Sequence, residues 1–188
     1  PSGPMDQYAF RLANRVLGNG EQCPALEITV TGPTLKFNTD VVIALAGASM
    51  QATLDGDAID FWEPVSVKRG SVLKLRGIQG AGQRAYLAVQ GGFDVPKYMN
   101  SCATFTLGQF GGHGGRALRA GDVLRIHPSK LSMAQRVSNC AVIPPELRPH
   151  YGSHWQIKVM YGPHGAPDYF TEEDISIFFK THWQVHYN

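Results

Sequence analysis

Residues 84–125, RAYLAVQGGFDVPKYMNSCATFTLGQFGGHGGRALRAGDVLR, hold the strongest structural signals in the chain. The apolar run Arg84–Gln90 predicts a strand that is buried on at least one face. Gly91 and Gly92 end this strand, and five further glycines crowd residues 108–115. Because glycine adopts positive φ and lets the backbone approach a ligand closely, the segment suits a carboxylate or a phosphate. The alternative is a set of tight β-turns without a ligand.

Nucleotide-binding motifs are missing from the same stretch. No Gly-Lys-Ser/Thr follows the glycines, as a P-loop requires. The glycine spacing also fails to match the dinucleotide fingerprint between a strand and a helix. The segment therefore does not predict a nucleotide site.

Composition excludes several classes of protein. With 188 residues, 43% of them hydrophobic, the chain is long enough for one packed domain or for one domain and part of another. The formal net charge is +2 and no basic run is interleaved with aromatic residues, so nucleic acid is not an expected partner. No segment approaches the roughly 18 apolar residues that a membrane span needs. Three widely spaced cysteines without a Cys-x-x-Cys pair predict free thiols in a reducing cytoplasm.

Short apolar segments bounded by glycine, proline or aspartate predict a mostly β chain. Residues Asp6–Leu17 predict one helix, because apolar side chains recur there at helical spacing. The predicted strands are Leu26–Thr31, Thr34–Phe37, Val41–Ala46, Ala52–Leu54, Val65–Val67, Val72–Leu75 and Val123–Ile126. Asp55-Gly56-Asp57 predicts a hairpin turn. So many short strands at close spacing indicate a sandwich or a barrel.

The chain is predicted to contain three regions. These are a β-barrel subdomain with an N-terminal helix at 1–130, a proline-rich linker at 131–152, and the beginning of a second, truncated subdomain at 153–188. In the last region, Trp155–Met160 predicts a strand, Thr171 predicts a helix cap with Asp174 three residues on, and Val185–Tyr187 begins another strand. One strand and one helix cannot bury a core of their own, so this region is expected to pack on the barrel or to belong to a larger domain.

Several long pieces of the chain resemble the allophanate-hydrolase-subunit-2 family, and most closely the carboxyltransferase domain of urea carboxylases. The pieces are PSGPMDQYAFRLANRVLGN at the start, ALEITVTGPTLKF, YLAVQGGFDVP, residues 101–108, FGGHGGR, GDVLR and YGPHGAPDYFT near the end. The resemblance therefore spans nearly the whole chain. One departure is that the family pattern Gly-Ser-Arg/Lys-Ser-Thr stands here as Asn100–Thr104, without its basic side chain.

The resemblance implies a cyclophilin-like β-barrel with one or two short helices, followed by the start of a second β-rich subdomain. It implies part of a biotin-dependent urea carboxylase, in which a carboxyl group passes from carboxybiotin to urea and gives allophanate. The implied partners are urea, the biotin carboxyl carrier and biotin carboxylase domains of the same polypeptide, and the remainder of the carboxyltransferase domain. Biotin would be carried on another domain, and ATP and Mg would act only in the other domains. The isolated chain is then expected to be inactive.

Two other functions stay open at this point. A protein similar to the 5-oxoprolinase subunits would process a lactam in place of urea. A non-catalytic regulatory or interaction module would need no reaction at all, and the departure at Asn100–Thr104 favours it. Turnover that depends on urea rather than on oxoproline would distinguish the two enzymes.

Three residues are candidates for proton transfer: Asp94, His113 and His164. Each histidine lies on a glycine-bounded turn, where an imidazole can exchange protons near neutral pH, and Asp94 follows two glycines. The alternative is that all three only form hydrogen bonds within their turns. Histidine pairs spaced four apart also occur, but neither has a third ligand nearby in the sequence, so no metal site is predicted.

A carboxyl-transfer pocket needs oriented backbone amides and cations around the carboxylate. The residues predicted to bind urea or carboxybiotin are Gly91, Gly92, Phe93, Ser101, Thr104, Gly111, Gly112, Arg116 and Tyr161. For Arg116, a salt bridge with Asp122 or Asp94 is an equal alternative to a bound carboxylate. The N-terminal motif adds Ser2, Met5 and Asp6, which either contribute to an anion site at the helix start or only cap the helix.

Overall fold

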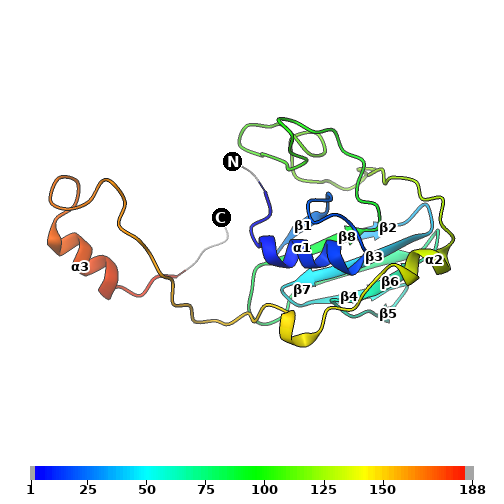
Figure 1. Ribbon diagram of the computed structural model, residues 1–188, viewed down its shortest axis with the longest axis horizontal. Coiled ribbons are helices and arrows are strands. Elements are labelled where there is room, and N and C mark those ends of the chain that lie inside the picture. Colours follow the sequence, from blue (N-terminus) through cyan, green and yellow to red (C-terminus); the bar gives the residue numbers. More distant parts are fainter. Residues whose placement is uncertain (1–2, 185–188) are drawn as a thin grey trace. The chain divides into compact units, whose positions relative to one another are not determined.

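The computed structural model describes residues 3–184 of the chain (Figure 1). The chain divides into two compact units, Pro1–Tyr151 and Gly152–Asn188, and each is described by itself. Ser2 and the predicted strand Val185–Tyr187 lie outside the described residues.

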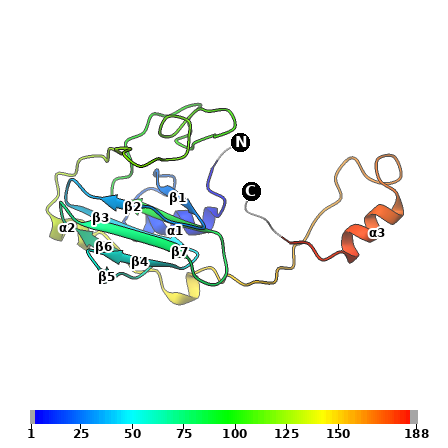
Figure 2. The ribbon, with the colours of Figure 1, turned by 180° about the vertical axis from the view of Figure 1, so that it is seen from behind.

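The first unit is built on two four-stranded antiparallel sheets, with the orders β1-β8-β3-β6 and β2-β7-β4-β5. The strands are β1 (Leu26–Thr29), β2 (Thr34–Lys36), β3 (Val41–Gly47), β4 (Met50–Leu54), β5 (Asp57–Ala58), β6 (Pro64–Val67), β7 (Val72–Ile78) and β8 (Arg84–Val89). Figures 1 and 2, which view the molecule from opposite sides, show the helix α1 (Gln7–Val16) on the side of the first sheet away from β4 and β7. The expected mostly β, barrel-type fold with a few short helices is confirmed, with its strands divided between two sheets and not joined in one closed ladder.

Strand β3 lies in the middle layer, which explains its uninterrupted apolar sequence. All seven of its residues are buried. Successive side chains of a strand point to opposite faces. Val42 and Ala44 accordingly belong to the core cluster formed with α1, whereas Ile43 and Leu45 belong to the cluster formed with the second sheet. The first sheet is therefore covered on both faces.

The turn between β4 and β5 is the hairpin that the sequence predicts. Asp55 and Gly56 connect the two strands, with φ of 54° and 105°. A two-residue turn with positive φ at both central positions matches the twist of the paired strands, and Asp-Gly is a preferred sequence for it. The Asp55 carboxylate also accepts a hydrogen bond of 2.7 Å from the Val72 amide, which ties the turn to β7.

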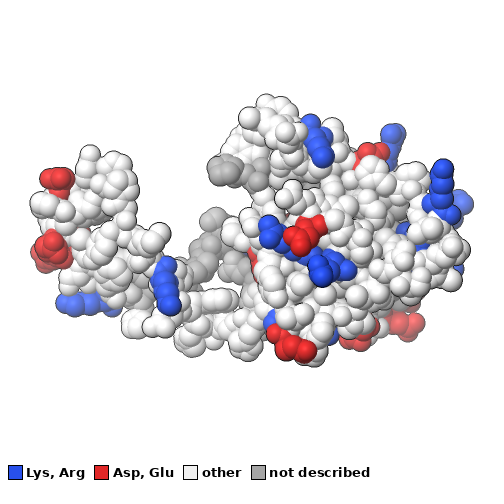
Figure 3. Space-filling view, in the orientation of Figure 1, with Lys and Arg blue, Asp and Glu red and all other residues white. Residues whose placement is uncertain are grey.

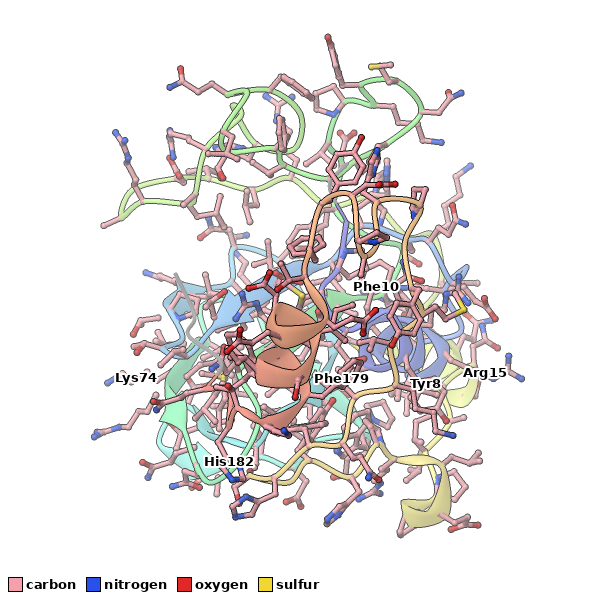
Figure 4. The ribbon with its side chains drawn as sticks, turned by 90° about the vertical axis from the view of Figure 1, so that its left-hand side faces the viewer. Tyr8, Phe10, Arg15, Lys74, Phe179 and His182 are labelled. Carbon is pink, nitrogen blue, oxygen red and sulfur yellow. The ribbon has the colours of Figure 1, made fainter. Side chains whose placement is uncertain are left out.

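Helix α1 begins where the sequence predicts a cap. The Asp6 carboxylate accepts a hydrogen bond of 3.0 Å from the Ala9 amide. Phe10 packs edge-on against the buried ring of Tyr86, with 5.9 Å between ring centroids. Figure 4 labels Tyr8, Phe10 and Arg15 along the helix. Among the described residues, no helix has the length and apolar character to cross a membrane.

The segment 131–152, predicted as a linker, contains ordered elements. These are α2 (Met133–Ser138) and the short 3₁₀ helix η1 (Pro145–Leu147). Ser132 and Gln135 form a reciprocal capping box at the start of α2. The buried Arg136 donates to the Gln90 side chain (2.9 Å) and to the Asp40 carbonyl (3.0 Å), which fixes α2 beside the end of β8 and the start of β3.

Two predicted strands do not form among the described residues. Val123–Ile126 makes a single bridge, between Ile126 and Phe93, and continues no further. Trp155–Met160 in the second unit has no regular structure, because a strand needs a hydrogen-bonding neighbour and the described part of this unit supplies none. The predicted cap at Thr171 is present: Thr171 and Asp174 form a capping box ahead of α3 (Glu172–Lys180).

Candidate functional site

The glycine-rich segment folds into a loop that borders an open hollow of about 260 Å³. The hollow is lined by Pro96, Lys97, Tyr98, Gln109, Phe110, Gly111, Gly112, Gly114 and Gly115. All of these residues belong to the segment that follows β8. The hollow therefore lies where the sequence predicts a carboxylate site, and we take it as the candidate functional site.

Two tight turns give this loop its shape. Tyr98 and Ser101 exchange backbone hydrogen bonds of 2.9 Å across one turn, and Phe105 and Phe110 exchange bonds of 2.9 and 3.3 Å across the other. The Phe110 ring packs against both Tyr98 and Phe105, at centroid distances of 4.6 and 5.2 Å. Both separations lie in the range of favourable aromatic contacts. The three aromatic side chains thus join the two turns, and Tyr98 and Phe110 line the hollow.

Gly111 and Gly112 form another wall, where the chain folds back on residues 103–104. Both have positive φ, 76° and 51°. A Cβ atom at Gly111 would collide with the Ala103 carbonyl oxygen, and one at Gly112 with the Thr104 hydroxyl oxygen. These two glycines are therefore required by the packing of the loop, and they leave bare backbone facing the hollow.

A charged cluster joins the end of the glycine-rich segment to Asp122. The Arg116 guanidinium donates two hydrogen bonds to the Asp122 carboxylate, of 2.7 and 2.8 Å. The Arg119 amide adds a third, of 2.7 Å, and His113 Nε2 lies 3.8 Å from an Asp122 oxygen. The Arg116 guanidinium, followed by the Arg119 amide, holds the pKa of Asp122 well below its usual range. Of the two interpretations of Arg116, this structure contains the salt bridge.

The strand-end candidates lie apart from the lining of the hollow. The Gly91 amide donates to the Asn19 side chain (2.8 Å), and a Cβ atom at Gly92 would collide with the Cys23 sulfur. Phe93 is part of the hydrophobic core and is 7% exposed. Asp94 is exposed, and its amide donates to the Arg125 carbonyl (2.9 Å). Gly91, Gly92 and Phe93 therefore anchor the base of the loop.

Ser101 and Thr104 support the loop from within. The Ser101 hydroxyl accepts a hydrogen bond of 3.1 Å from the Ala103 amide. The Thr104 hydroxyl lies against the backbone of Gly112. Neither side chain is among those that line the hollow.

The backbone amides of Met5 and Asp6 in the N-terminal motif are hydrogen-bonded within the chain. The Met5 amide donates to Glu27 Oε2, and the Asp6 amide donates to the Tyr86 hydroxyl, each at 2.8 Å. The Tyr86 hydroxyl donates in turn to Glu27 Oε2, and the Tyr151 hydroxyl donates to Asp6 Oδ2. Burial raises the pKa of both tyrosines. The capping interpretation of Asp6 therefore matches the geometry.

Tyr161 and His164 lie in the second unit, and both are exposed. His164 packs edge-on against Tyr169 with 4.7 Å between ring centroids. The exposed Phe179 on α3 and His182 beyond it are labelled in Figure 4. The structure thus brings His113 and Arg116 together around Asp122, and describes His164 and Tyr161 only within their own unit.

A larger groove of about 470 Å³ occurs elsewhere in the first unit. It is lined by Gly47, Ser49, Met50, Ile59, Asp60, Phe61, Trp62, Glu63 and Arg148. Its lining mixes both signs of charge and contains none of the predicted site residues. Figure 3 likewise shows acidic and basic side chains interspersed over one face of the molecule. We therefore retain the smaller hollow as the candidate site.

Five lining residues outside the glycine cluster are absent from the predicted site: Pro96, Lys97, Tyr98, Gln109 and Phe110. A signal was present, since Lys97-Tyr98 stands directly before the segment that lacks the basic side chain of the family pattern. The two turns determine which side chains meet across the loop. The backbone pairs that close these turns, Tyr98–Ser101 and Phe105–Phe110, cannot be predicted from the sequence alone.

Comparison with known proteins identifies the family. All 188 residues match the family model described as the carboxyltransferase domain, subdomain A and B. The chain is 49% identical, over 190 aligned residues, to urea amidolyase from Saccharomyces cerevisiae, covering 100% of the chain and 10% of that protein. It is 44% identical to a 5-oxoprolinase subunit from Escherichia coli over 128 residues, covering 68% of the chain and 41% of that protein. The crystal structure of Kluyveromyces lactis urea carboxylase superimposes with a TM-score of 0.86 at 44% identity, covering 100% of this chain and 17% of that one.

The chain therefore belongs to the carboxyltransferase domain family. It spans about 10% of the length of the urea amidolyases that it matches. The family resemblance seen in the sequence motifs is confirmed over the whole chain.

Proposed function

We propose that this chain is part of the carboxyltransferase domain of a biotin-dependent urea carboxylase and takes part in carboxyl transfer from carboxybiotin to urea, giving allophanate. The observation that carries the proposal is the end-to-end match to urea amidolyase, at 49% identity over 190 residues. The match to the 5-oxoprolinase subunit covers only 68% of the chain, which favours urea over a lactam as the substrate. The chain is a small part of its relatives, so the complete reaction would require segments outside it.

The hollow fits the chemistry of a transferred carboxyl group. Its lining includes one lysine, two aromatic residues and neighbouring glycines, at Lys97, Tyr98, Phe110 and Gly111–Gly112. Glycine backbone admits a planar ligand closely, and the ammonium group supplies positive charge for a carboxylate. When bound, biotin on a carrier domain would supply the carboxyl group, and ATP and Mg would act in other domains of the parent protein.

His113 is the best placed of the three candidates for proton transfer. It stands between Gly112 and Gly114, which line the hollow, with its Nε2 atom 3.8 Å from Asp122. A bond must form between the carboxyl carbon and a urea nitrogen while the bond to the ureido nitrogen of biotin breaks. We assign to His113 the transfer of a proton from the urea nitrogen to the ureido nitrogen of biotin. Asp94 and His164 stay candidates for proton transfer.

A chimera would test the proposed function. In Saccharomyces cerevisiae urea amidolyase, the segment that matches this chain would be replaced by residues 1–188. We expect urea-dependent ATP cleavage and allophanate formation, and no response to 5-oxoproline. The purified 188-residue chain, given urea and free carboxybiotin, is the matched control and should form no allophanate.

Two outcomes would contradict the proposal. In the first, the chimera folds and cleaves ATP with hydrogen carbonate, yet urea adds nothing. In the second, the chimera responds to 5-oxoproline in place of urea, which would support the lactam alternative.

A further inference from the structure

The charge of the hollow comes from a single side chain. Among the described residues that line it, Lys97 carries a positive charge and no aspartate or glutamate is present. Lys97 is flanked in the lining by apolar surface from Pro96, Tyr98 and Phe110. Lys97 is exposed, so the attraction of its ammonium group for an anion should weaken as salt is added.

The nearby guanidinium is committed to another partner. Both terminal nitrogens of Arg116 are hydrogen-bonded to Asp122, and one of them also donates to the Ala117 carbonyl at 2.9 Å. A carboxylate in the hollow would have to displace Asp122 to reach this fork. Arg116 is also absent from the lining. Asp122 therefore neutralises the arginine, and the positive charge available to a ligand is that of Lys97.

We propose that Lys97 is the residue that binds the carboxylate in this hollow, and that Asp122 keeps Arg116 in a supporting position behind it. The inference rests on the proposed function in one respect, since the physiological carboxylate is taken to be the group in transfer. The binding itself follows from the lining of the hollow and holds for a simple carboxylate.

Acetate is the probe for this inference, and acetamide of the same shape is its neutral control. The ¹⁵N-labelled chain would be titrated with each compound at constant ionic strength, and the amide signals of Gly111, Gly112 and Gly114 followed by NMR. We expect saturable shifts with acetate and none with acetamide. Equal shifts with both compounds, or none with acetate, would overturn the inference.

Two substitutions of Lys97 separate its charge from its bulk. Lys97→Met retains an unbranched stem without the ammonium group and should weaken acetate binding about tenfold, as expected for the loss of one charge-assisted hydrogen bond. Lys97→Arg retains the charge and should restore binding to within about threefold of the original chain. Lys74→Met is the matched control, because Lys74 is an exposed lysine on β7 (Figure 4) and should not affect binding. Unchanged binding in Lys97→Met would overturn the inference.

The same substitution in the chimera distinguishes this inference from the proposed function. If Lys97→Met loses acetate binding while urea turnover by the chimera is unchanged, Lys97 binds the carboxylate but the hollow is not the site of transfer. If Lys97→Met binds acetate normally while the unsubstituted chimera turns over urea, the proposed function stands and the role of Lys97 is wrong.

Discussion

At the scale of single residues, Tyr86 shows how one hydroxyl group can join distant parts of the fold. It accepts from the Asp6 amide and donates to Glu27, each at 2.8 Å, and its side chain is fully buried. We expect Tyr86→Phe to lower the free energy of unfolding by roughly 1–3 kcal/mol, because it leaves the partly buried Asp6 amide without its acceptor and removes one of the donors to Glu27.

Tyr8→Phe is the matched control for this substitution. The Tyr8 hydroxyl donates to the Leu147 carbonyl at 2.8 Å, but its side chain is 50% exposed, so water replaces the lost bond. The cost should stay below about 0.5 kcal/mol. Chemical denaturation of both variants measures the difference, and equal losses would show that the buried network contributes nothing beyond one ordinary hydrogen bond.

The Arg116–Asp122 pair leads to a prediction about pH. Because the pKa of Asp122 is lowered in the folded chain by Arg116 and the Arg119 amide, the carboxylate stabilises the fold above its unfolded pKa of about 3.9. That contribution is lost as the pH falls through the lower, folded value. Asp122→Asn should therefore lower the melting temperature at pH 7, and the difference from the original chain should narrow below about pH 4.

Asp57→Asn provides the reference for this pH series. Asp57 is exposed on the short edge strand β5, so its substitution should change the melting temperature little at either pH. A difference for Asp122→Asn that stays constant down to pH 2.5 would show that the ion pair does not account for the effect.

At the scale of elements, the glycine loop offers a comparison between two neighbouring glycines. Gly112 and Gly114 both have positive φ, 51° and 69°. A Cβ atom at Gly112 would collide with Thr104, whereas one at Gly114 would meet nothing within 4 Å. Gly114→Ala should cost about 1 kcal/mol from backbone strain alone. Gly112→Ala should cost more and should also abolish acetate binding, because the loop must shift away from residue 104.

Thermal unfolding and the acetate titration would measure both alanine variants. If Gly112→Ala behaves like Gly114→Ala in stability and in binding, the close packing of Gly112 on Thr104 is not what shapes the hollow.

Elements whose signals are local could be predicted from the sequence, and those that depend on distant partners could not. The Asp55-Gly56 turn and the Asp6 and Thr171 caps carry their own hydrogen-bonding groups, so their residues suffice to predict them. Trp155–Met160 has apolar residues typical of a strand but no neighbour to pair with among the described residues. The helix α2 has a readable capping box at Ser132 and Gln135, which the prolines around it obscured.

The difference between local signals and distant partners also explains which residues of the candidate site could be predicted from the sequence. The glycine segment was identified because its composition is unusual, and the hollow does lie within it. Lys97 was missed, because its place in the lining depends on Tyr98, Phe105 and Phe110 folding the loop back on itself. The neighbours of Phe93 in the sequence predict a binding residue, and in the structure its side chain belongs to the hydrophobic core.

At the scale of the whole molecule, the two units differ in how they are stabilised. Both clusters of buried hydrophobic residues lie within residues 9–143, in the first unit. The second unit has no fully buried side chain among its described residues, and Trp155, Met160 and Trp183 are 60%, 95% and 68% exposed. Apolar surface of this extent is typical of a segment that packs against another part of a protein. We propose that it packs against the remainder of the carboxyltransferase domain.

Truncation would test this difference between the units. A chain ending at Tyr151 retains both core clusters and the hydrogen bond from Tyr151 to Asp6, so it should unfold cooperatively with nearly the same melting temperature as residues 1–188. A chain ending at Pro149 loses Tyr151 and leaves Asp6 with one partner fewer, so its melting temperature should be lower by a few degrees. If the chain ending at Tyr151 fails to fold while the 188-residue chain folds, the second unit must contribute to the stability of the first. The two units would then not be independently stable.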